Sequence, residues 1–328
     1  MTLIDRLRPI FVLAGIGAVG YLVFRIGPAA IWNIVRDLSW RLPLVLLFPT
    51  CVAVVADTLA WRFTFLSPPR SFARLLGVRL AGDALNQITP TASVGGDVWR
   101  ALLLRPGVPL RESVASVVAD KTTSVTSQLL LLVAGVLVAG QAGLVSPTAV
   151  WVMAVAAAVE ALCIAGFVAV QLSSVVGGGG RLLAKLRIPL SPERQAALDG
   201  TDQALRTLYS ERGFRVFVSV LWHFAGAAMG ALEVYVFVRL LGVPISVGSA
   251  FAIGAFGSAV KFFSFMVPGS LGALEGGNVA IFSAFGLGQA TGLTYTLVRR
   301  LREIVWIAAG FLASSLLSSR PAPPAARE

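Results

Sequence analysis

Two short segments of this sequence place a proline, several glycines and one acidic residue at the same spacing. Residues 90–97 read Pro-Thr-Ala-Ser-Val-Gly-Gly-Asp and residues 268–275 read Pro-Gly-Ser-Leu-Gly-Ala-Leu-Glu, so the proline precedes the acid by seven positions in both. Proline and glycine interrupt a helix, and a helix that restarts among the glycines presents free N–H groups and a positive dipole end. Such a helix start suits an anion such as phosphate.

Small and charged residues around the two segments are candidates for a polar site inside a membrane. An ionisable side chain within a span costs about 2.5–3.5 kcal/mol or more, so it normally faces the bundle interior and finds a partner. The candidates for substrate binding and translocation are Asn86, Pro90, Gly95, Gly96, Asp97, Arg100, Asp120, Lys121, Glu233, Pro268, Gly269, Gly272, Glu275, Arg299, Arg300 and Glu303.

Local spacing predicts some of the ion pairs. Asp120 and Lys121 are neighbours and cannot share a helix face, so each needs a partner elsewhere. Asp97 and Arg100 are three residues apart and can pair within one helix.

Several other charged positions allow two interpretations. Arg299 and Glu303 have the four-residue spacing of a helical pair, and Arg302 fits equally a site residue or a snorkelling one at the membrane boundary. Asp57 is near a span end and fits an interfacial position. The only histidine, His223, lies in an apolar run, which favours helix packing over a role as a proton relay.

The sequence lacks the usual signatures of catalysis. It has no metal-ligand cluster, no Ser/His/Asp or Cys/His set and no phosphate-binding loop of the Gly-x4-Gly-Lys type. We therefore expect no catalytic residues, no metal, no cofactor and no enzyme activity.

The elements that position these residues follow from composition. Of the 328 residues, 56% are hydrophobic and only 13% are charged, whereas soluble domains carry about 25% charged residues. The apolar residues come in long runs, which excludes a β-barrel and predicts an all-α, polytopic integral membrane bundle of about seven or eight transmembrane helices. Predicted spans lie at about 10–27, 42–61, 112–140, 148–172, 214–241 and 244–265, with a Gly-rich interruption at 267–288 and a final span ending near 318.

The two Pro/Gly segments indicate an internal repeat. The acids Asp97 and Glu275 are 178 residues apart, and Lys121 and Arg300 are 179 apart. We predict a single membrane domain over residues 1–328, with repeat halves at about 42–172 and 214–318 and a cytoplasmic linker at about 173–213. Non-helical backbone at membrane depth must pack against protein or line an aqueous cavity, so both segments are predicted to be re-entrant elements of a transport site. The alternative is two ordinary cytoplasmic loops.

The net charge of +11 is assigned to basic loops beside membrane helices rather than to nucleic-acid binding. The Lys and Arg count places residues 62–111 and 173–215 in the cytoplasm, together with the N-terminus.

At these residues the sequence resembles the flippase-like transmembrane domain of lysylphosphatidylglycerol synthases and its stand-alone relatives. The first half matches through Asn86, Pro90, Gly95-Gly96-Asp97 and Arg100, and the second through residues 268–276. Residues 120–123 and 297–303 look most like the hopanoid-biosynthesis-associated subgroup. Lys121 stands where many relatives have Arg, and Ser270 replaces the second glycine of the family's Pro-Gly-Gly pattern. The resemblance implies a bacterial inner-membrane location.

The resemblance implies a translocase that moves a lipid or lipid-linked headgroup between leaflets, with a membrane lipid of anionic or lipid-linked headgroup as its partner. Arg100, Arg299 and Arg300 would hold the phosphate, and Asp97, Glu275 and Asp120 would orient these arginines or receive a cationic headgroup. Two alternatives are an intramembrane lipid-modifying enzyme and a non-catalytic scaffold for a lipid (hopanoid) biosynthesis complex.

Overall fold

The computed structural model describes residues 47–88, 94–173, 192–264 and 272–318, apart from positions 68, 70 and 106, together with isolated positions between 24 and 44. The predicted first span at about 10–27, apart from Phe24, lies outside the described residues, as do Pro90, Pro268 and Gly269.

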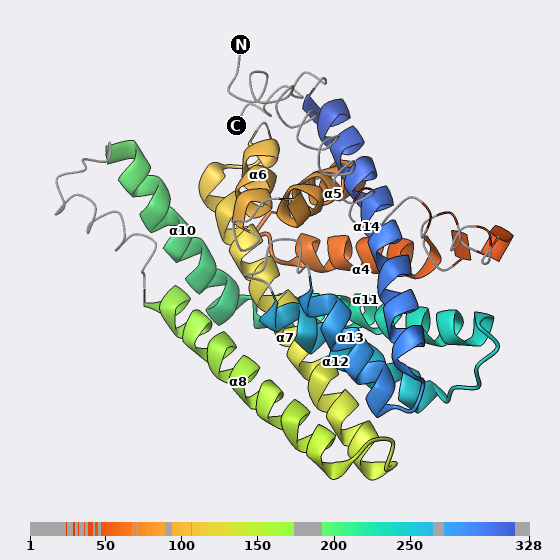
Figure 1. The fold of residues 1–328 in the computed structure, drawn as a ribbon. Helices are drawn as coiled ribbons and strands as arrows, with labels where there is room; N and C mark the ends of the chain where they lie inside the picture. The colour runs from red at the N-terminus through yellow and green to blue at the C-terminus, as the bar shows by residue number, and fades with distance from the viewer. Residues whose placement is uncertain are drawn as a thin grey trace.

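The described chain is helical, with no strand among these residues (Figure 1). Beyond a short 3-10 turn at Ser39–Arg41, the helices are α4 (Phe48–Phe63), α5 (Phe72–Ile88), α6 (Val94–Leu104), α7 (Leu110–Gln141), α8 (Pro147–Leu172), α10 (Pro192–Glu211), α11 (Gly213–Leu240), α12 (Val247–Phe263), α13 (Ala273–Ala284) and α14 (Gln289–Ser318).

The long apolar runs form long helices, as predicted. Three of the described helices, α7, α8 and α11, are long and apolar enough to cross a membrane, and α12 is a shorter apolar helix. Their bounds differ from the predicted spans by at most three residues, and α10 covers the hydrophilic stretch that follows α8. The predicted all-α membrane bundle is confirmed.

Local chemistry defines the helix ends at the turns between spans. The Ser146 hydroxyl caps α8 by accepting from the Ala149 N–H at 3.3 Å, directly before the proline that opens this helix. The Ser246 hydroxyl caps α12 in the same way through the Ser249 N–H at 3.0 Å. A side-chain oxygen at this position satisfies one of the free N–H groups of a helix start.

Residues 62–111, which the Lys and Arg count placed in the cytoplasm, contain the helices α5 and α6. The two helices form an antiparallel hairpin in which Arg74 Nη2 near one end donates to the Leu103 carbonyl at 3.4 Å. Helix α5 buries Leu75, Val78 and Leu85 on one face. Three- and four-residue spacing of apolar side chains makes an amphipathic helix even where arginines raise the overall polarity.

Residues 267–288, predicted as an interruption, contain the helix α13. It packs on both α12 and α14, and Leu274, Ile281 and Phe282 are buried. Its first turn begins after Gly272, whose φ of +82° belongs to the left-handed region that glycine adopts without strain.

Helices from different parts of the chain pack along one another in matched pairs. Helix α4 lies along α11, α5 along α14, and α12 along α7. The backbones approach closely at Gly310, where an added Cβ would overlap the Leu80 carbonyl, and at Gly135, where it would overlap the Ala255 side chain. The order of a helix, a two-helix hairpin and another helix occurs in both α4–α7 and α11–α14. The domain boundaries and the duplication themselves stay predictions.

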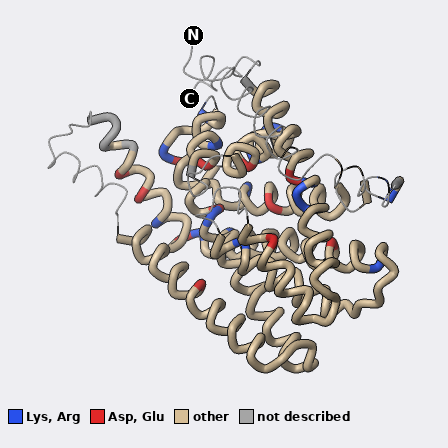
Figure 2. The backbone as a smooth tube through the Cα atoms, in the orientation of Figure 1, with Lys and Arg blue, Asp and Glu red and all other residues tan. Residues whose placement is uncertain are grey.

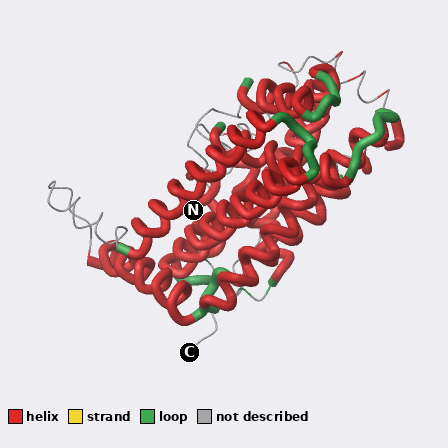
Figure 3. Tube along the Cα trace, turned by 90° about the horizontal axis from the view of Figure 1, so that it is seen from below, coloured by secondary structure: helices red, strands yellow, loops and turns green. Residues whose placement is uncertain are grey.

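The charged positions concentrate in one part of this bundle (Figure 2). Helix α8 is almost free of them and exposes Trp151, Val155 and Leu162 along its length, as expected for a surface that faces lipid. Seen from below, the helices run side by side as a bundle (Figure 3). Helix α10, within the stretch predicted as a linker, buries Leu205 and Leu208 against α7.

Candidate functional site

Eight charged or titratable side chains form one connected network, which we call the first-half cluster because all of them except His223 lie in the predicted first half. Its members lie on α4, α5, α6, α7 and α11 and are joined by hydrogen bonds or by contacts within 4 Å. They are Asp57, Arg79, Asp83, Asp97, Arg100, Asp120, Lys121 and His223.

Arg79 lies at the centre of the first-half cluster. Its Nη1 donates to the Asp57 carbonyl at 2.7 Å and lies 3.3 Å from both carboxylate oxygens of Asp120. Its Nε lies 3.8 Å from the carboxylate of Asp83, one turn further along α5. Arg79 is buried, and its guanidinium is the kind of planar group that suits several carboxylates at once.

Arg100 on α6 contacts the same acids from the other side. It bonds to Asp83, lies 3.3 Å from Asp120 and lies 3.7 Å from Asp97. The Asp97 contact confirms the pair predicted from helical spacing. Its guanidinium also lies over the ring of Trp61, 5.3 Å from the centroid, which adds a cation–π contact.

The tip of the α5–α6 hairpin is held by polar contacts within the chain. The Gly96 N–H donates to Asn86 Oδ1 at 2.7 Å, and Asn86 Nδ2 donates to Asp97 at 3.1 Å. A Cβ at Gly96 would overlap the Gly82 carbonyl, so only glycine fits this crossing. At the start of α13 the Gly272 N–H likewise donates to Glu275 at 2.7 Å. Side chains of the protein itself thus take N–H groups that the sequence predicted for an anion.

His223 lies between two carboxylates. Its Nδ1 is 2.8 Å from Asp57 Oδ1 and its Nε2 is 2.9 Å from Asp120 Oδ1. The ring is 1% exposed. The sequence favoured helix packing for this residue; the structure adds the two hydrogen bonds, and it places Asp57 in the network rather than at an interface.

The charges of the second half are arranged differently. Arg300 binds Glu275 at 3.0 Å and Glu303 at 2.9 Å, and Arg302 bonds to Glu233. The predicted pair of Arg299 with Glu303 does not form, because Glu303 faces Arg300 instead. The Glu233 contact makes Arg302 part of the bundle interior rather than a snorkelling residue.

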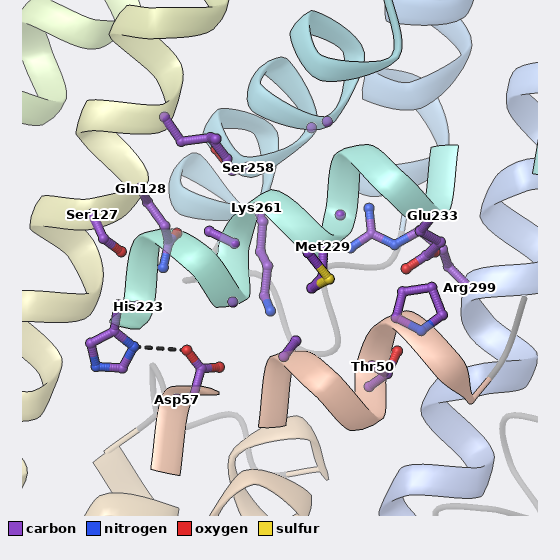
Figure 4. A pocket seen from close by; sticks show the side chains of 18 of the residues that line it. Thr50, Asp57, Ser127, Gln128, His223, Met229, Glu233, Ser258, Lys261 and Arg299 are labelled. Carbon is purple, nitrogen blue, oxygen red and sulfur yellow. Dashed lines mark hydrogen bonds and ion pairs between the residues drawn. The ribbon is translucent and has the colours of Figure 1, made fainter. Parts of the chain in front are cut away.

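A cavity of about 220 Å³ separates the two sets of charges (Figure 4). It is bounded by α4, α7, α11, α12, α13 and α14, and this volume is far above the roughly 10–15 Å³ that one water molecule needs. Its charged or titratable lining residues are Asp57, His223, Glu233, Lys261, Tyr295, Arg299 and Arg302, and its polar ones include Thr50, Ser124, Ser127, Gln128, Ser258 and Asn278.

Two cations in this lining lack a carboxylate partner among the described residues. Lys261 is exposed because it extends into the cavity, and neither it nor Arg299 has an acidic oxygen within 4 Å in the described part of the chain. The Nε of Arg299 is buried without a hydrogen-bond partner there. The guanidinium of Arg299 lies 5.7 Å from the ring centroid of Tyr295, which supports it from one side.

The cavity contains few of the residues predicted from sequence. Glu233 and Arg299 line it, whereas Asn86, Gly96, Asp97, Arg100, Asp120 and Lys121 belong to the α5–α6 hairpin and the first-half cluster. Gly95 lies in the first turn of α6, and Gly272, Glu275, Arg300 and Glu303 lie around the start of α13. Their proposed binding roles stay predictions.

Sequence reasoning missed Lys261 as a site residue. It was visible as one charge near the end of an apolar helix, but its position opposite Asp57 and His223 depends on packing between helices. Within the described residues, no group of three or more His, Cys, Asp and Glu side chains is placed to hold a metal ion.

Comparison with known proteins gives two kinds of similarity. Residues 10–310 match the family model described as the lysylphosphatidylglycerol synthase TM region. Two UPF0104 membrane proteins of Methanothermobacter thermautotrophicus are similar over most of the chain, one 22% identical over 318 residues with 92% of each chain covered, the other 26% identical over 323 residues with 88% of each covered. No solved structure matches the chain. The comparisons do not address the hopanoid-associated subgroup.

Proposed function

Because the chain belongs to the lysylphosphatidylglycerol synthase TM region family, we propose that it is a lipid translocase that moves a lipid with an anionic phosphate headgroup between leaflets. The chain is a multi-pass membrane protein, and the proposal adds the cargo and the movement. The observation that supports it is the cavity with Lys261 and Arg299, two cations without a carboxylate partner in the described chain.

Unpaired cations inside a membrane bundle need compensation. A single Arg or Lys in a span costs about 2.5–3.5 kcal/mol even on insertion scales. Lys261 is repelled by Arg299 and Arg302 and attracted only at longer range by Glu303 and Asp83. A bound phosphodiester supplies negative charge in direct contact with Lys261 and Arg299. The guanidinium of Arg299 offers two parallel donors to phosphate oxygens, and the Lys261 ammonium adds a mobile point charge.

The uncharged part of the lining suits the remainder of a headgroup. Hydroxyl and amide groups of Ser127, Gln128, Ser258 and Asn278 surround the cations. These groups replace water around a headgroup while the acyl chains remain in the bilayer, which lowers the desolvation cost of crossing. In this proposal the paired arginines Arg100 and Arg300 hold the hairpins in position and do not contact the lipid.

The proposal includes the bacterial inner membrane as location, a cytoplasmic N-terminus, and transport without bond-making chemistry. A lipid-modifying enzyme in the same cavity would leave a chemically altered lipid, which mass spectrometry of the reconstituted membrane detects. Unchanged lipid after complete exchange between leaflets is the result that the translocase predicts.

The test is lipid exchange in reconstituted vesicles. Phosphatidylglycerol with a fluorescent acyl chain is bleached from outside by dithionite, so the bleachable fraction reports exchange between leaflets. We expect the protein to raise this fraction above the half that protein-free vesicles give, and Lys261→Met combined with Arg299→Gln to return it to that level.

The matched control is Arg239→Gln. Arg239 is an exposed arginine near the end of α11, outside the cavity. Its loss removes one positive charge from the same helix bundle without touching the site. Exchange that persists in the double variant, or that is lost equally in the control, contradicts the assigned site.

A further inference from the structure

We propose that His223 and its two carboxylates form a proton-binding site, and that one proton crosses the membrane together with the anionic headgroup. This inference deepens the proposed function, because it assigns the co-transported ion to the same cavity. It rests on the hydrogen-bond geometry of His223, on the balance of charges in the first-half cluster and on the cavity that both His223 and the headgroup site line.

The hydrogen bonds of His223 require one more proton than a neutral ring can supply. A neutral imidazole has one N–H donor and one acceptor nitrogen. Here both nitrogens face carboxylate oxygens, Asp57 at 2.8 Å and Asp120 at 2.9 Å, and a carboxylate only accepts. Both contacts are satisfied when the ring is imidazolium, so the geometry assigns a second proton to it.

The charges of the first-half cluster lead to the same result. Its acids are Asp57, Asp83, Asp97 and Asp120, and its permanent cations are Arg79, Arg100 and Lys121. Four negative charges against three positive ones leave one negative charge, which a single imidazolium cancels. Asp120 is the buried acid of this set, with its side chain 3% exposed, and an uncompensated buried charge is costly, so the bound proton stabilises the surroundings of Asp120.

The proton belongs to the ring rather than to a carboxyl group because of the arginines. Arg79 contacts both Asp57 and Asp120, and Arg100 also contacts Asp120. Each guanidinium favours the ionised form of the acid beside it. The remaining charges near the site are Asp83, which also contacts Arg79, and Lys261 across the cavity.

The proton has a route to water through the cavity. His223 and Asp57 both line it, and the Asp57 side chain is 31% exposed while that of Asp120 is 3% exposed. Figure 4 shows the His223–Asp57 hydrogen bond on the same side of the cavity as Ser127. The Lys261 side chain extends into the cavity in the same view. A proton from cavity water reaches the ring through Asp57, and leaves as the ring returns to neutral imidazole.

The proton and the anionic headgroup each strengthen binding of the other because both bind at the same cavity. An anionic headgroup held by Lys261 and Arg299 adds negative charge beside the imidazolium, which favours retention of the proton. By linkage the bound proton favours the headgroup by the same factor. Proton and lipid therefore cross in the same direction, and the lipid collects in the leaflet that faces the alkaline compartment.

The experiment imposes a pH gradient on the exchange assay. We expect wild-type protein to enrich fluorescent phosphatidylglycerol in the leaflet on the alkaline side, beyond the level in protein-free vesicles, and nigericin to abolish the enrichment. His223→Gln should show no such enrichment, whereas the control Arg239→Gln should show the enrichment of the wild type. Exchange that ignores the gradient in wild-type protein overturns the proton site alone, whereas no exchange under any condition contradicts the proposed function and the coupling with it.

A second measurement needs no variant. Because His223 is the only histidine in the chain, 15N-histidine labelling gives one pair of ring signals. At about pH 7.5, where a free imidazole in water is mostly neutral, we expect the imidazolium pattern with both nitrogens protonated. A neutral tautomer under these conditions overturns the proposal.

Discussion

The two halves of the molecule place different chemistry at positions 178 residues apart. In the first half Arg79 and Asp83 on α5 and Arg100 on α6 form a closed network of ion pairs. At the corresponding positions the second half has Gly257, Lys261 and Asn278. Arg79 fills the interior of its half, whereas a Cβ on Gly257 would still be 3.8 Å from Asn278 and 4.0 Å from Arg299.

This difference means that the charges of the first-half cluster stabilise the fold, whereas Lys261 and Arg299 are free to bind a ligand. In the first-half cluster Arg79 and Arg100 each lie within 4 Å of the buried Asp120, so removing either one takes a cation away from a buried acid. In the second half Lys261 and Arg299 line an open cavity and lose no such partner when replaced. In the proposed function the first-half cluster is the structural and proton-holding network, and the cavity with Lys261 and Arg299 is the anion site.

The largest effect is expected from Arg79→Met. It leaves Asp57, Asp83 and Asp120 without their central cation, and breaking a buried ion pair from one side costs about 3–5 kcal/mol. The free energy of unfolding in mixed micelles should fall by that amount. Lys261→Met, which removes a cation without a carboxylate partner, should change it by less than about 1 kcal/mol; equal losses in the two variants would break the comparison.

The next largest loss of stability is expected from a glycine substitution in the α5–α6 hairpin, compared with one in the α12–α13 helix pair. Gly96→Ala forces a Cβ into the Gly82 carbonyl and should cost about 1–3 kcal/mol, as overpacking does. Gly257→Ala adds the same methyl group where the nearest atoms leave room, so its melting temperature should stay close to that of the wild type. Similar melting temperatures for both variants would mean that the two hairpins pack alike.

A smaller effect is expected when a third cation is freed. Glu233→Gln removes the carboxylate that Arg302 contacts, so this guanidinium can bind a headgroup. One additional charge-assisted hydrogen bond contributes about 1.5 kcal/mol, or roughly tenfold. Soluble glycerol phosphate should therefore inhibit exchange at about a tenfold lower concentration, and an unchanged inhibitory concentration would place Arg302 outside the binding surface.

The smallest effect is expected at Lys121, which is 178 positions from Arg299. Its side chain is 42% exposed and lies 3.6 Å from Asp97, and pairs of such exposure contribute about 0–1 kcal/mol. Lys121→Gln should have nearly the stability and the lipid-exchange activity of the wild type, whereas Arg299→Gln should lose exchange. Equal loss of exchange in both variants would show that the two positions have the same role.

Apolar run length predicted the helices well because it is a property of local sequence. The helices near Gly95 and Gly272 also begin where the Pro/Gly pattern indicated. Helix α5 was missed, since Arg74 and Arg79 made the stretch look hydrophilic while its apolar face is buried in the bundle. An average of hydrophilicity along the chain does not show that one face of a helix is apolar.

The site was less predictable because its pairs join distant parts of the chain. Helical spacing predicted the pair of Asp97 with Arg100 but could not give His223 its partners, which are 166 and 103 residues away. The translocase hypothesis gave Arg100 and Arg299 the same phosphate-holding role, although the structure surrounds the first with acids and directs the second into the cavity.

Reaction of a single cavity cysteine tests the central claim most directly. Ser258 lines the cavity, so Ser258→Cys, with Cys51 and Cys163 replaced by serine, places one thiol beside Lys261 and Arg299. We predict that an anionic methanethiosulfonate reacts with it faster than a cationic one, that phosphatidylglycerol slows this reaction, and that Lys261→Met removes the preference. Equal rates for the two reagents, or protection by neutral lipid alone, would contradict an anion site in this cavity.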